Sequence, residues 1–380
     1  MNYNFKPYLD KIENELKAAL PLLPEQQWKN DSFGQLSPVV NAVHISPLIS
    51  PTRTLVNLGG KRWRPLLLVL CAEAEAEARF LEKKISKEEM ELCVQKAYHL
   101  TPLVEFVHTA SLIHDDIEDS SDMRRGAPAA YITYGTDTAI NAGSWLYFEA
   151  TVCIDNSKCT EEQKGKLYAA YAMELRRLHL GQAMDIAWHR DNNARPTAEE
   201  YLAMVRCKTG TLASLAARIG MLASKSTATS ADTASRIAAD IGAGFQIIDD
   251  VTNLTTGNPG KKRGDDIVET KKSLPVLLFA KKYFDNEEKC VELKSCFEAA
   301  RKDGIDSPAV EKAISLLEES GVIAAAKEKG ISLVENGCLE FQKLFGEKNK
   351  AAEKISYLFK NMIEPKDEKK NHLEKGGQNV

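Results

Sequence analysis

Apolar residues recur at helical spacing along most of this chain. Near the start, Phe5, Leu9, Ile12, Leu16 and Leu20 are three or four positions apart, which places them on one face of an α-helix. Similar periodicity returns in nearly every later segment, while the alternation of apolar and polar residues that marks β-strands is almost absent. The pattern predicts an all-α fold.

Several helix starts are marked by capping signals. Three positions have the capping-box spacing, in which Ser or Thr is followed three residues later by Glu or Gln: Ser86 with Glu89, Thr160 with Gln163, and Thr197 with Glu200. Ser307 precedes a proline at an expected first helical position. Together with the apolar periodicity, these signals divide the chain into about ten helices.

Two regions lack the helical pattern. Residues 21–60 contain five prolines and indicate an irregular connection with short helices. Residues 364–380 are mostly polar and charged, which predicts a disordered tail. The chain shows no internal repeat and no interdomain linker, so we expect residues 1–363 to form one large helical bundle.

The composition is that of a folded globular protein, with 43% hydrophobic and 27% charged residues. A formal net charge of −4 argues against a dedicated nucleic-acid binder, and no apolar stretch approaches the roughly 20 residues that cross a bilayer. The N-terminus lacks the apolar run of a secretory signal, and the eight cysteines are scattered without a C-x-x-C pair. We therefore expect a cytoplasmic protein with reduced thiols, no nucleic-acid partner and no membrane insertion.

An acidic segment follows directly on an apolar helical run. Residues 105–113 are mostly apolar and lead into Asp115, Asp116 and Asp119 without a turn. On a helix, Asp115 and Asp119 lie one turn apart on the same face, with Asp116 about 100° round the axis. Crowded carboxylates need cations, and Mg²⁺ suits such oxygen ligands better than a softer metal. A single segment of this kind is nevertheless more often a solvated helix end.

A second acidic segment favours a metal site over a solvated helix end. Residues 244–248 are again mostly apolar and lead into Asp249 and Asp250, with Asn253 in place of the last acid. Two such segments facing each other across a bundle would line a cavity that holds several Mg²⁺ ions on a diphosphate. Asn253 can accept a contact but brings no charge, so one ion would be held more weakly.

Basic residues occur where a diphosphate would need them. The sequence GGKRWRP at residues 59–65 supplies three cations at an expected helix start. Further cations follow later in the chain: Arg124, Arg125, Lys208, Lys261 and Lys271. Each alone is more often a solvated surface residue, so the evidence lies in their order along the chain.

The ordered series resembles the trans-isoprenyl diphosphate synthase (polyprenyl synthetase) family. The motifs that carry this resemblance, in chain order, are GGKRWRP, VHTASLIHDDIEDSSDMRRG, GQAMDI, VRCKTGTL, GFQIIDDVTN and GKKRGDDIVETKKSLP. The resemblance implies an all-α bundle around a deep central cavity, a homodimer, and Mg²⁺-dependent condensation of isopentenyl diphosphate with an allylic diphosphate.

The resemblance also implies roles for individual residues. The metal ligands would be Asp115, Asp116, Asp119, Asp249 and Asp250. The allylic diphosphate would be bound by Arg124, Lys208, Lys261 and Lys271. Isopentenyl diphosphate would be bound by Lys61, Arg64, His108 and Arg125. The catalytic set would be Lys208, Thr209, Gln246 and Asp115, supported by Gln182 and Asp185.

The expected mechanism rests on charge. Metal ions and cationic side chains would stabilise the departing diphosphate, so that the allylic C–O bond breaks to a delocalised cation. The double bond of isopentenyl diphosphate then attacks this cation, and loss of a proton leaves a chain one isoprene unit longer. Water must be kept out because it would capture the cation as an alcohol.

The turn before the first acidic segment bears on product length. Ala110 and Ser111 are small at positions where farnesyl-length members of the family carry bulky aromatics, and Val107 and Val104 would lie deeper. The resemblance therefore predicts a product of geranylgeranyl length or longer.

Three alternatives remain open. One is a farnesyl diphosphate synthase; another is a terpene cyclase or head-to-head synthase, against which Lys61, Arg64 and Arg125 argue because a cyclase has no second diphosphate to bind. The third is a catalytically silent regulatory subunit, which the retained acidic residues disfavour.

Overall fold

The structure is a computed structural model and describes residues 3–191, 194–257 and 262–363. The first half of the chain forms α1 (Lys6–Ala19), α2 (Gln26–Phe33), α3 (Ala42–Asn57), α4 (Trp63–Leu81), α5 (Lys87–His99), α6 (Pro102–Glu118), α7 (Ala130–Tyr134), α8 (Thr136–Glu149), α9 (Val152–Asp155) and α10 (Glu161–Arg190). The second half forms α11 (Ala198–Val205), the π-helical turn η1 (Arg206–Gly210), α12 (Thr211–Ala223), α13 (Ala228–Thr255), α14 (Asp265–Val268), α15 (Leu274–Lys282), α16 (Glu287–Asp303), α17 (Pro308–Glu319), α18 (Val322–Phe345) and α19 (Lys350–Ile363). A two-residue hairpin pairs β1 (Met123–Arg124) with β2 (Ala127–Pro128), and the predicted all-α fold is confirmed.

The predicted helix starts are also confirmed. Ser86, Thr160 and Thr197 each cap a helix with the reciprocal hydrogen bonds of a capping box. Ser307 caps α17, whose first residue is Pro308. The expected number of about ten helices was wrong, because the described residues form nineteen α-helices. Several of these are shorter than ten residues, too short for apolar periodicity to reveal them.

Residues 21–60 are more regular than predicted. Instead of an irregular connection they contain α2 and the sixteen-residue α3, with Pro47 and Pro51 inside α3. An interior proline removes a helix hydrogen bond, which is why the sequence argued against a long helix here. Burial of Ile49 and its apolar neighbours offsets this cost, and the side chain of Asn41 caps the helix start.

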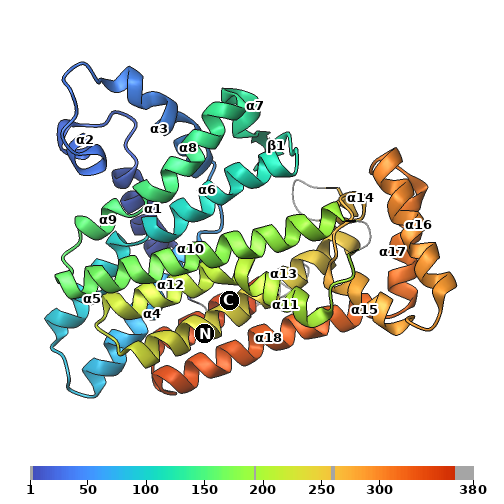
Figure 1. Ribbon diagram of the computed structural model, residues 1–380. Coiled ribbons are helices and arrows are strands. Elements are labelled where there is room, and N and C mark those ends of the chain that lie inside the picture. The colour runs from blue at the N-terminus through green and yellow to red at the C-terminus, as the bar shows by residue number, and fades with distance from the viewer. Residues whose placement is uncertain (1–2, 192–193, 258–261, 364–380) are drawn as a thin grey trace, which may run out of the picture.

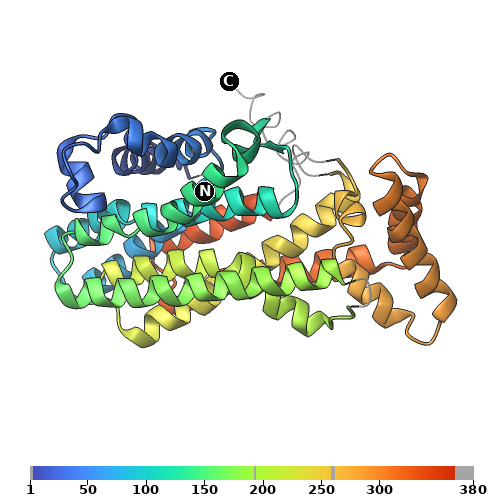
Figure 2. The same ribbon diagram turned by 45° about the horizontal axis from the view of Figure 1, so that its top comes forward.

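The body of the molecule is a bundle in which α10, α12, α13 and α18 run side by side (Figure 1). Helices α13 and α18 contribute buried side chains to both of the larger hydrophobic clusters, so the core continues along their length. Helices α16 and α17 stand at one end of this bundle in both views (Figure 2). The acidic segments sit on the bundle helices α6 and α13, which fixes their positions.

A pair of glycines lets α13 and α18 approach closely beside the second acidic segment. A Cβ atom on Gly244 would lie 2.7 Å from the carbonyl oxygen of Gly330, and one on Gly330 would lie 3.0 Å from that of Gly244. Any side chain at either position would force the helices apart. The close packing therefore helps to set the position of Asp249 and Asp250, one turn further along α13.

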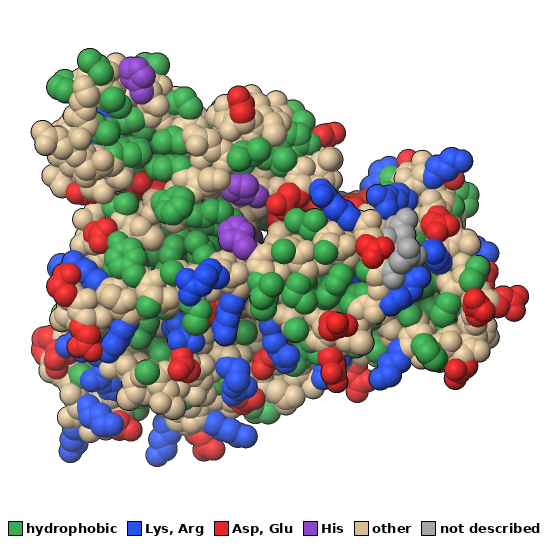
Figure 3. All heavy atoms as spheres, in the orientation of Figure 1, with side chains coloured by type: hydrophobic (Ala, Val, Ile, Leu, Met, Phe, Trp, Pro, Cys, Tyr) green, Lys and Arg blue, Asp and Glu red, His purple; other side chains and the backbone are tan. Residues whose placement is uncertain are grey.

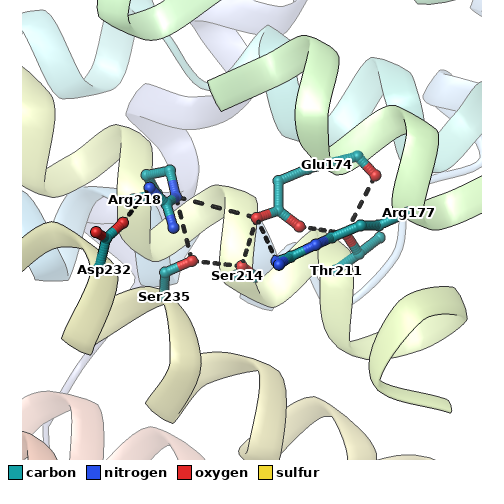
Figure 4. A network of polar contacts seen from close by, with 7 residues as sticks. All are labelled: Glu174, Arg177, Thr211, Ser214, Arg218, Asp232 and Ser235. Carbon is teal, nitrogen blue, oxygen red and sulfur yellow. Dashed lines mark hydrogen bonds and ion pairs between the residues drawn. The ribbon is translucent and has the colours of Figure 1, made fainter. Parts of the chain in front are cut away.

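A buried carboxylate ties three bundle helices together. Glu174 on α10 accepts hydrogen bonds from Thr211 and from Ser214, the latter at 2.9 Å (Figure 4). Ser214 also bonds Ser235 on α13, and Arg218 reaches both Ser235 and Glu174. Because Thr211 is the first residue after η1, this network anchors one end of the π-helical turn.

Two further expectations concern the ends of the chain and its relation to membranes. The predicted disordered tail, residues 364–380, lies outside the described residues. In the described part, every helix is too short or too polar to cross a membrane.

Candidate active site

The π-helical turn η1 presents Lys208 and Thr209 toward the interior of the bundle. A π-helical turn accommodates one extra residue and is often found at functional sites. At Gly181 on α10, a Cβ atom would lie 2.3 Å from the backbone nitrogen of Lys208, so the helix and the turn are in backbone contact. This contact requires glycine and fixes the depth at which Lys208 enters the site.

Three helices meet at the first acidic segment. Gln182 on α10 donates hydrogen bonds to Asp115, at 2.8 Å, and to Glu118. Lys208 donates to Asp185 at 2.6 Å. Burial lowers the pKa of Lys208, but Asp185 and Asp115 outweigh this effect and raise it overall. The lysine is therefore charged and lies close to both carboxylates.

A hydrogen-bonded chain connects η1 to the second acidic segment. The hydroxyl of Thr209 donates to Oε1 of Gln246 at 2.8 Å, and the amide of Gln246 donates to Asp250 at 2.9 Å. Asp250 also accepts a 2.6 Å hydrogen bond from Tyr201 on α11. Because the Thr209 hydroxyl is committed as a donor, its oxygen lone pairs remain available to an electron-poor centre.

Lys271 links the two acidic segments electrostatically. Its ammonium group lies 3.2 Å from Asp266 and 2.6 Å from Glu269. Burial lowers its pKa, but Asp266, Glu269 and Asp119 together raise it well above the usual value. Asp119, at the end of α6, belongs to the first acidic segment, and Asp266 also raises the pKa of Asp250 in the second. Lys271 is therefore coupled directly to the first segment and, through Asp266, to the second.

The carboxylates of the site are crowded enough to hold protons. Burial raises the pKa of Asp115 to about 6, with Asp119 and Glu118 adding to the effect and Lys208 opposing it. Burial and the carboxylate of Asp266 raise the pKa of Asp250 to about 7. The protein's own cations therefore do not neutralise these carboxylates fully, and the site favours an additional cation.

Asp116 and Arg124 form an ion pair in this structure. Asp116 is buried and accepts a 2.7 Å hydrogen bond from Nε of Arg124 in the β1–β2 hairpin. The family resemblance assigns the first of these residues to a metal and the second to the allylic diphosphate. Both roles require the pair to open or to be shared with the ligand.

A second basic site lies around the start of α4. The guanidinium of Arg62 is held by three protein groups. It donates hydrogen bonds to Glu13 at 2.7 Å, to Glu105 at 2.5 Å and to the carbonyl oxygen of Val56 at 2.6 Å. Its backbone adopts a left-handed conformation with φ of 47°, which these three contacts hold in place. Arg62 is thus a structural residue.

Arg64, by contrast, is available to a ligand. Its guanidinium stacks on the ring of Trp63 at 4.5 Å, and its buried Nε has no hydrogen-bond partner among the described residues. Burial, with the nearby Arg125 cation, lowers the pKa of Arg64 to about 10. Burial and four surrounding arginines likewise lower the pKa of His108 well below its usual value. This concentration of positive charge favours an anion.

Arg125 is oriented by the glycine turn that precedes α4. Its guanidinium donates to the carbonyl oxygens of Gly59 and Leu55. A Cβ atom on Gly60 would lie 3.2 Å from the Arg125 guanidinium, so the turn packs against it. Lys61, in the same turn, is exposed.

Known proteins share the sequence pattern over most of this chain. The sequence pattern described as polyprenyl synthetase matches residues 46–316. A geranylfarnesyl diphosphate synthase from Natronomonas pharaonis is 32% identical over 284 residues, covering 73% of this chain and 78% of the relative. A geranylgeranyl pyrophosphate synthase from Macrophomina phaseolina is 33% identical over 267 residues, which cover 70% of this chain and 74% of the relative. The chain belongs to the polyprenyl synthetase family.

The fold of this polyprenyl synthetase agrees with a solved structure. The geranylgeranyl pyrophosphate synthetase of Pyrococcus horikoshii matches it with a TM-score of 0.76 at 25% identity, covering 95% of this chain and 97% of that one. The family membership predicted from the ordered motifs is confirmed, and with it the assignment as a prenyltransferase.

The donor set of this polyprenyl synthetase fits Mg²⁺. All of the predicted ligands are carboxylates, the oxygen donors that Mg²⁺ prefers. Within the described residues, however, there is no cluster of three or more His, Cys, Asp or Glu side chains arranged to hold a metal by themselves. A bound ion would need further oxygens from water or from a diphosphate, which is the usual arrangement for Mg²⁺.

Some predicted residues differ from expectation and others were missed. Lys261 lies outside the described residues. Asn253 is buried, and its side-chain oxygen accepts a hydrogen bond from the backbone of Asp266 at 3.3 Å, so it supports the loop before Lys271.

Tyr201, the partner of Asp250, has no sequence signal of its own. Asp266 could have been found, because it lies in the last of the family-like motifs.

Proposed function

We propose that this chain condenses isopentenyl diphosphate with an allylic diphosphate, head to tail, and releases diphosphate. One observation carries the proposal: the site has two separate basic regions. One contains Lys208 and Lys271 among the acidic segments, and the other contains Arg64, His108 and Arg125. Two basic regions suit two diphosphate substrates, whereas a cyclase needs one.

The chain's own residues would divide the work between the two substrates. Arg64, His108 and Arg125 bind isopentenyl diphosphate, while Lys208 and Lys271 bind the allylic diphosphate and stabilise its negative charge as it departs. The Thr209 oxygen faces the developing carbocation with its lone pairs, held by its bond to Gln246. Gln182 and Asp185 orient Asp115 and Lys208.

Mg²⁺ is the cofactor that we propose for this reaction. It would be held by Asp115, Asp119, Asp249 and Asp250, with Asp116 once its pair with Arg124 opens. When bound, it supplies positive charge that favours departure of the allylic diphosphate.

We propose a product of geranylgeranyl length or longer. Ala110, Val107 and Val104 are fully buried on α6, and Ser111 bonds the backbone carbonyl of His108 at 2.9 Å. No bulky side chain at these α6 positions would stop a growing chain one turn below Asp115. The relatives from N. pharaonis and M. phaseolina, named for geranylfarnesyl and geranylgeranyl products, support this length.

Sizing the products tests the whole proposal. Purified protein is incubated with isopentenyl diphosphate, Mg²⁺ and one of three primers: dimethylallyl, geranyl or farnesyl diphosphate. Mass spectrometry of the products is expected to show chains of at least four isoprene units. A farnesyl end product would assign the chain as a farnesyl diphosphate synthase, and no product with any primer would favour a silent subunit.

Metal binding is expected to weaken in acid. The pKa values of Asp115 and Asp250, raised to about 6 and about 7, mean that both carboxyls are protonated below pH 6 and must lose a proton to bind Mg²⁺. We expect the apparent Mg²⁺ affinity to fall at least about tenfold between pH 8 and pH 5.5. Isothermal titration calorimetry in buffers of different ionisation enthalpy measures both the affinity and the released protons; an affinity independent of pH would contradict the prediction.

Arg62 and Arg64 provide a matched pair of substitutions. Arg64→Met is expected to raise KM for isopentenyl diphosphate about 10- to 100-fold, the value of one or two charge-assisted hydrogen bonds, and to leave KM for the allylic substrate unchanged. Arg62→Met leaves the buried Glu105 without its partner and is expected to destabilise the fold by about 3–5 kcal/mol. Steady-state kinetics and thermal unfolding of both variants distinguish the roles. Equal effects of Arg64→Met on both KM values would refute the assignment.

We propose a homodimer that uses the face formed by α8 and α10. Figure 3 shows hydrophobic side chains gathered on this face. On these two helices, Phe148 is 75% exposed and Leu180 is 56% exposed. Such a patch is unusual on a monomer surface. Sedimentation velocity is expected to show a dimer for the wild type and a monomer for Phe148→Glu combined with Leu180→Glu. The control, Leu81→Glu with Leu339→Glu at exposed positions elsewhere, should remain dimeric; a dimer in the test variant would exclude this face.

We also propose that the protein works in the cytoplasm. All eight cysteines are in the described residues, none forms a disulfide, and six are buried, which suits a reducing compartment.

A further inference from the structure

A cavity of about 790 Å³ lies between α11, α15 and α16, at the end of the bundle where α16 and α17 stand. Its walls are apolar and include Leu277 and Phe279 from α15 and Leu293 and Phe297 from α16. The volume is in the range of sites that enclose a whole small-molecule ligand. Within the described residues, its lining includes none of the active-site side chains named above.

The rim of this cavity carries an excess of positive charge. Its lining includes four cations, Arg195, Lys272, Lys281 and Lys294, and two carboxylates, Glu199 and Glu298. Glu298 forms a loose ion pair with Lys294 at 3.9 Å on the surface of α16. An apolar enclosure with a cationic rim is complementary to a molecule with an apolar body and an anionic end.

Lys272 is the cation best placed to meet such an anion. It is half-buried, and burial lowers its pKa. The cations Arg195, Lys294 and Arg301 lie close enough to lower it further, while Asp191 opposes them. Lys272 therefore lies among like charges, and an anion bound beside it would relieve their mutual repulsion.

We propose that this cavity binds a prenyl diphosphate, with the isoprenoid chain between α15 and α16 and the diphosphate at Arg195, Lys272 and Lys294. The choice of this ligand rests on the proposed function, since the enzyme would release such a molecule. The cavity itself does not depend on that function. Occupancy is non-covalent and requires no Mg²⁺, because the rim supplies the positive charge.

The cavity shares a segment of chain with the active site. Thr270 lines the cavity, has a left-handed backbone with φ of 57°, and donates a 3.2 Å hydrogen bond to the carbonyl of His189 on α10. Such a conformation is strained for a β-branched residue. The next residue, Lys271, bonds Asp266 in the active site, while Lys272 returns to the cavity. The segment that positions Lys271 in the active site therefore also forms part of the cavity wall.

Equilibrium dialysis of geranylgeranyl diphosphate in EDTA tests the proposal on the full chain. Ala280→Trp fills the cavity from α15, and Lys272→Glu with Lys294→Glu reverses the charge of its rim. The matched controls lie on exposed positions of α18: Ala325→Trp, and Lys327→Glu with Lys329→Glu. Lys208→Gln serves as the active-site control, because it removes a cation that binds the allylic diphosphate in the proposed function.

We expect one molecule bound per wild-type chain, and the same for the α18 controls and for Lys208→Gln. The dissociation constant should rise at least tenfold in both cavity variants. No binding in EDTA, binding lost in Lys208→Gln but kept in Ala280→Trp, or palmitate binding as tightly as geranylgeranyl diphosphate would each overturn the proposal. Because the assay involves no turnover, its result is independent of whether the chain forms product.

Discussion

Asp115→Asn is expected to lower kcat/KM for the allylic substrate by about 10²- to 10³-fold at saturating Mg²⁺. The substitution keeps the size of the side chain and an oxygen that can accept the hydrogen bond from Gln182, but it removes the negative charge. A neutral amide holds Mg²⁺ poorly, and it no longer supports the charge of the nearby Lys208. Steady-state kinetics with geranyl or farnesyl diphosphate measure the loss.

The neighbouring Glu118 offers the control for this experiment. Glu118→Gln makes the same chemical change on the same helix, at an exposed residue that also bonds Gln182. We expect it to change kcat/KM by less than about threefold, the scale of a surface electrostatic effect. If both variants lost the same activity, the loss would reflect disruption of the Gln182 contacts, and the metal role of Asp115 would be refuted.

Ala110→Phe is expected to shorten the product by at least one isoprene unit. Ala110 lies about one turn before Asp115 and is fully buried. Under the proposed function, an aromatic ring there would occupy volume that the growing chain needs. Overpacking is expected to reduce stability by about 1–3 kcal/mol, which the large core can tolerate. Chromatography or mass spectrometry of the products, with dimethylallyl diphosphate as primer, measures the change in length.

A second phenylalanine on α6 serves as the comparison. Ile113 is also fully buried but packs in a separate small cluster with Leu55 and Ala139. Ile113→Phe should therefore leave product length unchanged, although it adds bulk to the same helix. An unchanged product in Ala110→Phe would show that chain length is set elsewhere.

The parts of the site that the sequence predicted are those carried by local pattern. The acidic segments on α6 and α13, the basic turn before α4 and the caps of four helices all depend on residues within a few positions of one another. Short-range spacing is the property that helical periodicity and capping rules describe. The family-like order of these motifs then supplied the chemistry, which composition alone did not.

The features that the sequence missed depend on tertiary contacts that local spacing does not reveal. The hydrogen bond from Tyr201 to Asp250 joins positions 49 residues apart, and no local rule selects that tyrosine. The ion pair of Asp116 with Arg124 depends on the β1–β2 hairpin, which folds the arginine back over the end of α6. The prolines of α3 led to the wrong prediction of an irregular segment for a similar reason, because burial of apolar side chains outweighed the cost of proline inside a helix.

The π-helical turn has a consequence for how this chain can vary. Helix α11, η1 and α12 succeed one another without a break, and the extra residue in η1 rotates α12 by about 100° relative to α11. That rotation lets α11 bury Met204 in one cluster while α12 buries Leu215 in the other. The turn thus sets the rotation that allows the two successive helices to pack into two different hydrophobic clusters. Deleting one residue from it would rotate α12 by about 100° relative to α11 and disrupt the packing of one of the two clusters. We therefore expect the fold to tolerate substitutions in η1 better than deletions.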